Sequence, residues 1–264
     1  MKFTTRILAL IFVLMIAGLL SSNMILKKQY DAMDKSDIYW TYDKVLEQPF
    51  KYLNINGGNE TNIYYEPSPK PSVRLLQEWI KYHHGEIKAS VRNDTLYLNF
   101  DYKAASPFEK VWLRNSAPVR IFSPELLSIT GNNTHFEMQK VKQKSINVSI
   151  TGKSSFEVET MNKEMDSVNV YQRDSSEVVF EISPEYLTTV VTDKTRIGFK
   201  STTVDQTNKN ESISIRSVNA DIDGHSLLDV GHVQIQNLQL HIGDNSAIIL
   251  SGGALKRINA ARSR

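Results

Sequence analysis

Alternating apolar and polar residues dominate the chain from Phe50 to Leu250 and predict short β-strands. Typical stretches are Ile146-Asn147-Val148-Ser149-Ile150 and Val168-Asn169-Val170. Neighbouring side chains of a strand point to opposite faces, so this alternation places one row in a core and the other in water. The inward positions that this register predicts include Ile150, Val170, Val190 and Ile215.

A short turn signature separates these strands at nearly constant spacing. It consists of Gly or Asp, any residue, Ser or Thr, any residue, and an apolar residue. Its five copies follow one another in steps of 22, 19, 31 and 20 residues and begin at Gly152, Asp174, Asp193, Gly224 and Asp244. Repeats of about 20 residues built from strands and turns are typical of stacked coils. The expected fold is therefore all-β, a right-handed parallel β-helix or solenoid, with Thr202 to Glu211 as a loop within the long step.

Other strands are expected before these repeats. Ile87 to Phe100 contains two alternating runs around Asn93-Asp94, which predicts a tight hairpin. The segment from Ser72 to Tyr82 fits a strand with an irregular tail, although its apolar residues would also form a helix stripe. The further strands predicted here are Phe50 to Ile55, Thr61 to Tyr65, Val111 to Leu113 and Val119 to Phe122.

The N-terminus carries an apolar stretch that predicts one transmembrane helix. It runs from Ile7 to Leu26, about the length that a helix needs to cross ~30 Å of hydrocarbon. A cleaved signal peptide is the alternative, with Ser22 before the cut, but Leu20 then stands where a small residue is expected. The basic residues Lys2 and Arg6 favour a cytoplasmic N-terminus. We expect an uncleaved, single-pass anchor in the inner membrane with the β-domain in the periplasm.

Three parts of the chain follow from these patterns. Residues 1–28 form a cytoplasmic stub and the transmembrane signal anchor, residues 29–49 a juxtamembrane linker, and residues 50–259 the β-helix domain. The linker contains the aromatic cluster Tyr39-Trp40-Thr41-Tyr42, which either rests at the membrane interface or packs under the first strands.

Composition narrows the possible functions. The 31 basic and 29 acidic residues nearly cancel, and no basic stripe with interleaved aromatic residues is present, so we expect no nucleic-acid partner. The absence of cysteine excludes disulfides, thiolate metal sites, cysteine nucleophiles and a lipobox.

Few residue patterns point to chemistry. Asp221-Ile222-Asp223-Gly224-His225-Ser226 resembles a cation or acid-base cluster, but it lacks the distal Glu of a calcium loop and coincides with the turn signature. The adjacent pair His83-His84 points to opposite faces of a strand, and His232 and His241 have no partners at metal-site spacing. Ser251-Gly252-Gly253 is not a nucleophile elbow. We expect no catalytic, cofactor-binding or metal-binding residues, and no cofactor.

The run Asn56-Gly57-Gly58-Asn59, the connector with Pro67, Pro69 and Pro71, and the run from Val91 to Leu98 carry a resemblance. Together with the punctuated repeats, they are similar to the auto-transporter adhesin head family, also called the GIN domain, of Gram-negative envelopes. The resemblance spans about Phe50 to Leu250. It implies a pectin-lyase-type β-helix without conserved catalytic residues and an adhesion role.

These observations predict a membrane-anchored envelope protein of binding or scaffolding type, without catalysis. It would present a sheet face or the Thr202 to Glu211 loop to an envelope protein or a glycan. One alternative is a lyase acting on acidic polysaccharides, but the basic residues fall near turns among acidic ones, as in a solvated rim. These basic residues are Lys153, Arg173, Lys194, Arg196 and Arg216. The other alternative is a self-stacking scaffold, because the ends of such folds are open sheet edges.

Overall fold

A computed structural model of the chain divides into two compact units, Met1–Tyr42 and Asp43–Arg264. It describes residues 3–32, 36–82, 85–101, 107–159, 165–181, 185–199, 214–231 and 233–250. The first unit consists mainly of helix α1 (Phe3–Ala32), in which no side chain is buried. This helix is long and apolar enough to cross a membrane, a property that signal anchors share with signal sequences. It continues four residues beyond Lys28, the predicted end of the anchor.

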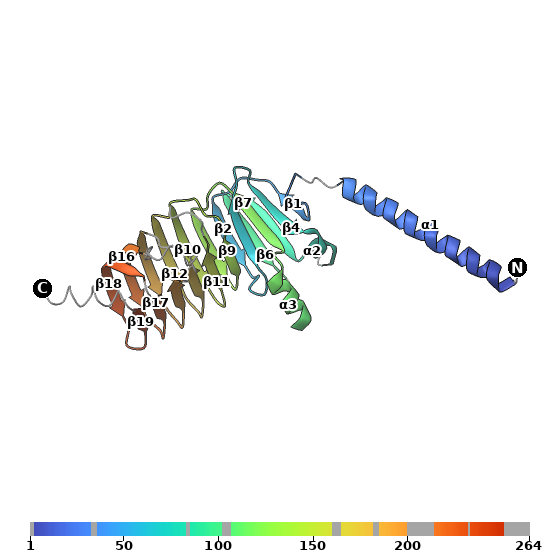
Figure 1. The fold of residues 1–264 in the computed structure, drawn as a ribbon. Coiled ribbons are helices and arrows are strands. Elements are labelled where there is room, and N and C mark those ends of the chain that lie inside the picture. Colours follow the sequence, from blue (N-terminus) through green and yellow to red (C-terminus); the bar gives the residue numbers. More distant parts are fainter. Residues whose placement is uncertain are drawn as a thin grey trace, which may run out of the picture. The chain divides into compact units, whose positions relative to one another are not determined.

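The second unit is built from two large β-sheets (Figure 1). One has ten strands, in the order β1 (Tyr42–Leu46), β4 (Ser72–Leu76), β7 (Val119–Ser123), β3 (Ile63–Pro67), β9 (His135–Met138), β11 (Ser155–Val158), β13 (Glu177–Phe180), β15 (Arg196–Phe199), β17 (Leu227–Gly231), β19 (Ala247–Leu250). The other has nine, in the order β18 (Gln234–Ile242), β16 (Ser214–Ile222), β14 (Tyr186–Val191), β12 (Ser167–Gln172), β10 (Ser145–Thr151), β8 (Ser128–Asn132), β2 (Tyr52–Asn56), β6 (Thr95–Phe100), β5 (Ile87–Arg92).

The expected right-handed parallel β-helix is wrong for this chain, because both sheets are mixed. Strand β4 pairs antiparallel with β7, and β5 pairs antiparallel with β6. In the second pair the chain folds back at Asn93 and Asp94, which have φ angles of 49° and 57°. Both values lie in the left-handed region that a two-residue hairpin requires. The predicted hairpin is thus confirmed, and the same turn interrupts the parallel arrangement that the repeats suggested.

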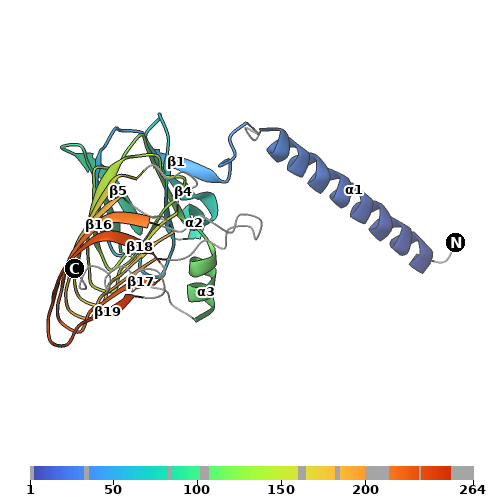
Figure 2. The same ribbon diagram turned by 60° about the vertical axis from the view of Figure 1, so that its left-hand side comes forward.

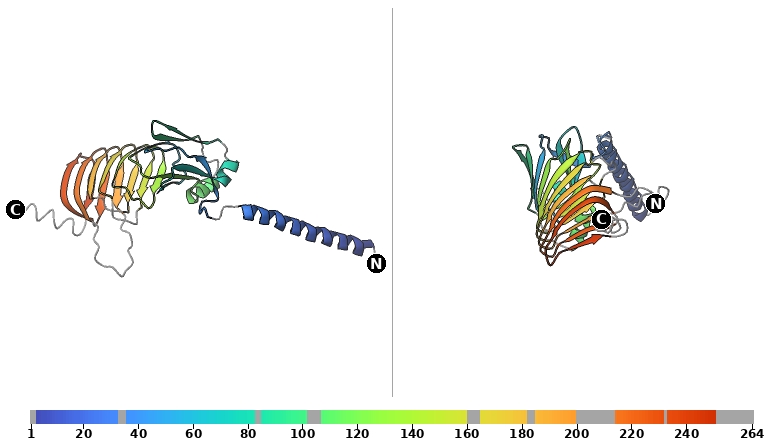
Figure 3. Two further views of the ribbon diagram at one scale, coloured as in Figure 1. Left: turned by 90° about the horizontal axis from the view of Figure 1, so that it is seen from above. Right: turned by 90° about the vertical axis from the view of Figure 1, so that its left-hand side faces the viewer.

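From β8 onward, the chain alternates between the sheets, and neighbouring strands pair in parallel (Figures 2 and 3). In the ten-stranded sheet, Ser155 pairs with Glu177, which pairs in turn with Arg196, followed by Leu227 and Ala247. These partners are separated by the same steps as the turn signature. The signature therefore records the spacing between adjacent strands of this sheet.

Backbone conformation and hydrogen bonding explain which residues occur in the turn signature. At Asp174, Asp193 and Gly224 the φ angles are 65°, 60° and 65°, a left-handed conformation that Gly adopts freely and Asp tolerates. In four of the five copies the Ser or Thr two positions later is buried, and in three copies its hydroxyl accepts a hydrogen bond from a backbone N–H of the adjacent turn. The Oγ atom of Ser226, for example, accepts a hydrogen bond from the backbone N–H of Thr195 at 3.3 Å. This use of a hydroxyl accounts for Ser154, Ser226 and Ser246 in the signature.

The core lies between the two sheets and follows the predicted alternation with one exception. Ile150, Val170 and Ile215 are buried as predicted. Val190 is only half-buried, because in β14 the inward position belongs to Thr189, which pairs with Val170 in register. Aromatic rings reinforce the core, with Phe136 and Phe156 stacked at 5.9 Å and Phe180 and Phe199 at 5.4 Å.

Two short helices replace segments expected to be extended. The predicted strand from Val111 to Leu113 is wrong, because these residues belong to helix α3 (Pro107–Asn115). Ser72 to Tyr82 begins with β4, as predicted, but its tail forms helix α2 (Gln77–Tyr82). The buried Trp79 of α2 stacks on Trp112 of α3 at 6.2 Å, so tertiary contacts favour helix here. Strand β1 lies within the predicted linker, so the folded unit begins before Phe50.

Candidate binding face

The acidic cluster singled out in the sequence forms a turn at the end of β16. Asp221 and Asp223 are both exposed, and Ile222 between them is fully buried. The Asp223 carboxylate accepts a hydrogen bond from the backbone N–H of Gly224 at 2.8 Å. Gly224 and His225 both have positive φ. The carboxylate of Asp223 therefore stabilises the turn itself.

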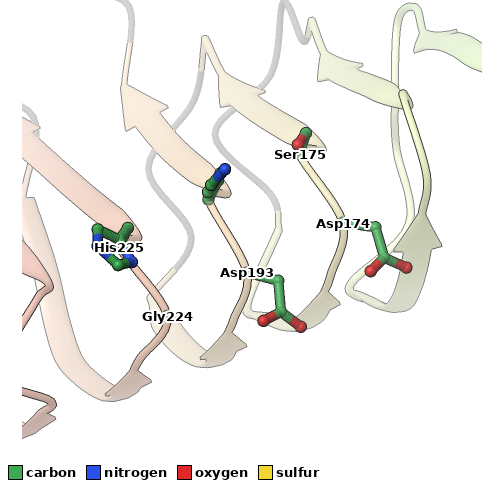
Figure 4. A pocket seen from close by; sticks show the side chains of 6 residues that line it. Asp174, Ser175, Asp193, Gly224 and His225 are labelled. Atoms are coloured by element: carbon green, nitrogen blue, oxygen red, sulfur yellow. The ribbon is translucent and has the colours of Figure 1, made fainter.

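Neighbouring turns together surround a shallow, solvent-open depression of about 540 Å³ (Figure 4). Figure 4 shows the carboxylates of Asp174 and Asp193 on successive turns pointing to the same side. Other residues at its border are Ser175, Lys194, Gly224 and His225. Among the residues that the structure describes, no three His, Asp or Glu side chains are grouped so as to hold a metal ion.

Several other candidates lie outside the described residues. They are His83, His84, His232, the run Ser251-Gly252-Gly253 and the loop from Thr202 to Glu211. His241 is exposed on β18, where it pairs in register with Asp221 of β16. These two residues belong to the outward face of the nine-stranded sheet.

Three of the five basic residues near the turns, Arg173, Arg196 and Arg216, form ion pairs. Arg196 contacts Asp229 at 3.0 Å and Glu177 at 3.6 Å, and Arg173 contacts Asp174 at 3.1 Å. All these side chains are a quarter or more exposed, so each pair contributes little to stability. The pairing nevertheless neutralises the charge of Arg173 and Arg196.

The outward face of the nine-stranded sheet has a different character, because it is nearly free of charge. The five central strands β2, β8, β10, β12 and β14 contain no Lys, Arg, Asp or Glu. Their outward positions carry hydroxyl, amide and phenol groups, and Val190 is the one aliphatic residue among them. Some of these groups are held by each other, since the Asn169 side-chain amide donates to Asn147 Oδ1 at 2.8 Å. We call this surface the uncharged face.

Four half-exposed tyrosines stand on the uncharged face and on strand β6 beside it: Tyr52, Tyr97, Tyr171 and Tyr186. Tyr97 and Tyr171 occupy the same cross-strand row, with Asn54, Thr130 and Ser149 between them. Four strand spacings separate these two tyrosines, or ~19 Å.

A hollow of about 460 Å³ lies at the β14, β16 and β18 end of the same sheet. Its outward lining consists of Thr188, Val190, Asn219, Asp221, Gln239 and His241. Tyr171 pairs with Val190 in register, so its ring stands at the border of this hollow. Arg216 of β16 donates a hydrogen bond to the hydroxyl of Tyr186 in β14 at 3.0 Å. That bond and the nearby Glu185 raise the pKa of the Arg216 guanidinium.

The ten-stranded sheet presents charged residues instead. Outward positions of its strands β9, β11, β13, β15 and β17 include Glu137, Glu157, Glu177, Arg196 and Asp229. In β3 of the same sheet, the buried Glu66 carboxylate contacts Arg120 at 2.7 Å and Lys140 at 2.9 Å. The two outer surfaces of the unit therefore differ in the chemistry they offer to a partner.

Comparison with known proteins relates the chain to adhesin-like folds. No family model and no curated protein sequence matches it. A crystal structure described as a "putative adhesin" from Bacteroides fragilis matches with a TM-score of 0.50 and 14% identity over 78% of this chain and 94% of that one. Two proteins of Parabacteroides distasonis, described as a "putative adhesin" and a "putative lipid binding protein", match with TM-scores of 0.43 and 0.40 and identities of 12% and 13%. They cover 80% and 78% of this chain, and 94% of each of their own chains is covered. The likeness to the Bacteroides fragilis protein concerns the fold.

The uncharged face was not recognised from the sequence, although a signal for it exists. The five strands without charge alternate along the chain with turns and strands that carry Glu, Asp, Lys or Arg. Only the strand order shows that these five segments are neighbours in one sheet. The depletion of charge therefore becomes a surface property only after folding.

Proposed function

We propose that this protein is a membrane-anchored cell-envelope protein of binding or adhesion type, without catalytic activity. The observation that carries this proposal is the uncharged face, a surface of hydroxyl, amide and phenol groups spanning five adjacent strands. The adhesin description of the Bacteroides fragilis protein with the same fold supports it, as does the resemblance of the sequence to the GIN domain family. The ion pairs of Arg173 and Arg196 argue against a lyase.

The binding surface can be tested with the full-length chain in detergent micelles. Thr130 is exposed in the middle of the uncharged face, so Thr130→Lys introduces a cation without disturbing the core. We expect this variant to bind envelope fragments of the producing cells about tenfold more weakly, because the new ammonium must be desolvated without a partner. Co-sedimentation with the fragments measures the effect.

A matched control places the same charge on the other sheet. Ser155 is half-buried on the ten-stranded sheet beside Glu177, its partner in register. We expect Ser155→Lys to bind the fragments as the unsubstituted protein does. Equal binding by all three proteins would show that the uncharged face is not the site of binding.

The membrane anchor makes a separate prediction. Helix α1 has thirty residues, so it is ~45 Å long and exceeds the ~30 Å of a hydrocarbon core. We expect most of the protein to remain in the membrane after an alkaline carbonate wash, with the β-unit in the periplasm. Release into the soluble fraction, with a new N-terminus near Ser22, would instead identify a cleaved signal peptide.

A further inference from the structure

The structure points to a neutral oligosaccharide as the ligand of the uncharged face, and we propose that the hollow beside Tyr171 is its main subsite. This inference rests on the proposed binding function and names the chemical class of the ligand. The hollow offers side-chain hydroxyl, amide, imidazole and carboxylate groups within one concave surface of about 460 Å³. Such groups both donate and accept hydrogen bonds, as sugar hydroxyls do.

Charge argues against other ligands. The hollow contains no Lys or Arg, and its one carboxylate, Asp221, would repel a polyanion such as an acidic polysaccharide or a nucleic acid. One carboxylate beside His241 is too few ligands for a dedicated cation site. A lipid chain would leave the polar groups of Thr188, Asn219 and Gln239 without hydrogen-bond partners, which is unfavourable for each group it buries.

The backbone of the face argues against an extended peptide. Peptides commonly bind sheets by adding a strand at an edge, where backbone N–H and C=O groups are unpaired. The hollow spans β14, β16 and β18, and β14 and β16 have neighbours on each side, whereas β18 is the last strand at this end of the sheet. Over β14 and β16, recognition must therefore rely on side chains, which favours a ligand that carries many hydroxyl groups along its length.

The tyrosines indicate how such a chain is oriented. Rings of Tyr97 and Tyr171 stand ~19 Å apart in one row, with Asn54, Thr130 and Ser149 between them. Along a single central strand, only three or four outward positions are available, whereas polar groups recur at every strand across the sheet. An oligosaccharide lying across the strands would stack sugar rings on both tyrosines and extend past Tyr171 into the hollow.

A printed array of neutral and acidic oligosaccharides tests this proposal with the full-length chain in detergent micelles. We expect binding to neutral glycans only, weakened about tenfold or more in Tyr171→Ala and in Asp221→Asn, because the first loses a stacking surface and the second a charged hydrogen-bond acceptor. Tyr171→Phe keeps the ring and should retain binding. Tyr82→Ala, which removes an exposed tyrosine from helix α2, is the matched control and should bind normally.

The outcomes separate this inference from the proposed function. Absence of neutral glycan binding, preference for acidic glycans, or binding that is insensitive to both Tyr171→Ala and Asp221→Asn would overturn the glycan proposal. If Thr130→Lys still weakened binding to envelope fragments in any of those cases, the face would be a binding surface for a different partner. Circular dichroism of each variant confirms that the fold is intact.

Discussion

Replacing Ile150 with Asp is expected to lower the free energy of unfolding by about 4 kcal/mol or more. Ile150 lies in β10 with 1% of its surface exposed, between the inward positions of Gly131 in β8 and Gln172 in β12. A carboxylate at this position would be buried without a cationic partner in register on either side. Urea unfolding followed by the fluorescence of the stacked Trp79 and Trp112 measures the change.

The matched control is Asn147→Asp on the same strand. Asn147 is exposed on the uncharged face, so a carboxylate there remains in water and can still accept the hydrogen bond of the Asn169 amide. We expect its unfolding free energy to change by about 0.5 kcal/mol or less. Similar losses in the two variants would contradict the assignment of inward and outward positions in β10.

Gly224→Ala should also destabilise the fold, by about 1–3 kcal/mol. Gly224 has a φ angle of 65°, and a Cβ atom added there would lie 2.5 Å from the backbone nitrogen of Asp193 in the adjacent turn. The obstacle is backbone, so no side-chain rotation relieves it. At about 2–4 °C for each kcal/mol in a domain of this size, the melting temperature should fall by several degrees.

Gly198→Ala provides the comparison in the same sheet. Gly198 has no positive φ, and an added Cβ would meet only the Arg196 Nε atom, at 4.0 Å. We expect its melting temperature to stay unchanged or rise slightly, because alanine restricts the unfolded chain. A melting temperature of Gly224→Ala equal to that of the unsubstituted protein would show that this turn tolerates a side chain.

The two sheets of the second unit carry different side chains on their outer faces. Charged positions on the ten-stranded sheet keep that surface hydrated, and many of them are engaged in ion pairs such as Arg196–Asp229. The nine-stranded sheet omits charge over five strands, so its groups can be desolvated by a neutral partner at lower cost. This asymmetry is the main physical argument for a binding function.

The sequence by itself determined much of the local structure, although not the helices α2 and α3. Alternation placed Ile150, Val170 and Ile215 in the core, and Asn93-Asp94 predicted the hairpin, because side-chain direction and turn conformation depend on neighbouring residues. The turn signature predicted the spacing of adjacent strands, because four of its five copies place their Gly or Asp at positive φ. The sequence also predicted a helix of the length and apolar composition of α1.

Only the tertiary structure decided which strands are neighbours. The antiparallel pairs β4–β7 and β5–β6 make the sheets mixed, and nothing in the repeat spacing of the later strands could reveal this. Thr189 rather than Val190 points inward because β14 follows the register of its neighbours, whose packing overrides the preference for an apolar residue. The uncharged face likewise arises from segments separated by about 20 residues or more, and strand pairing alone brings their outward side chains together.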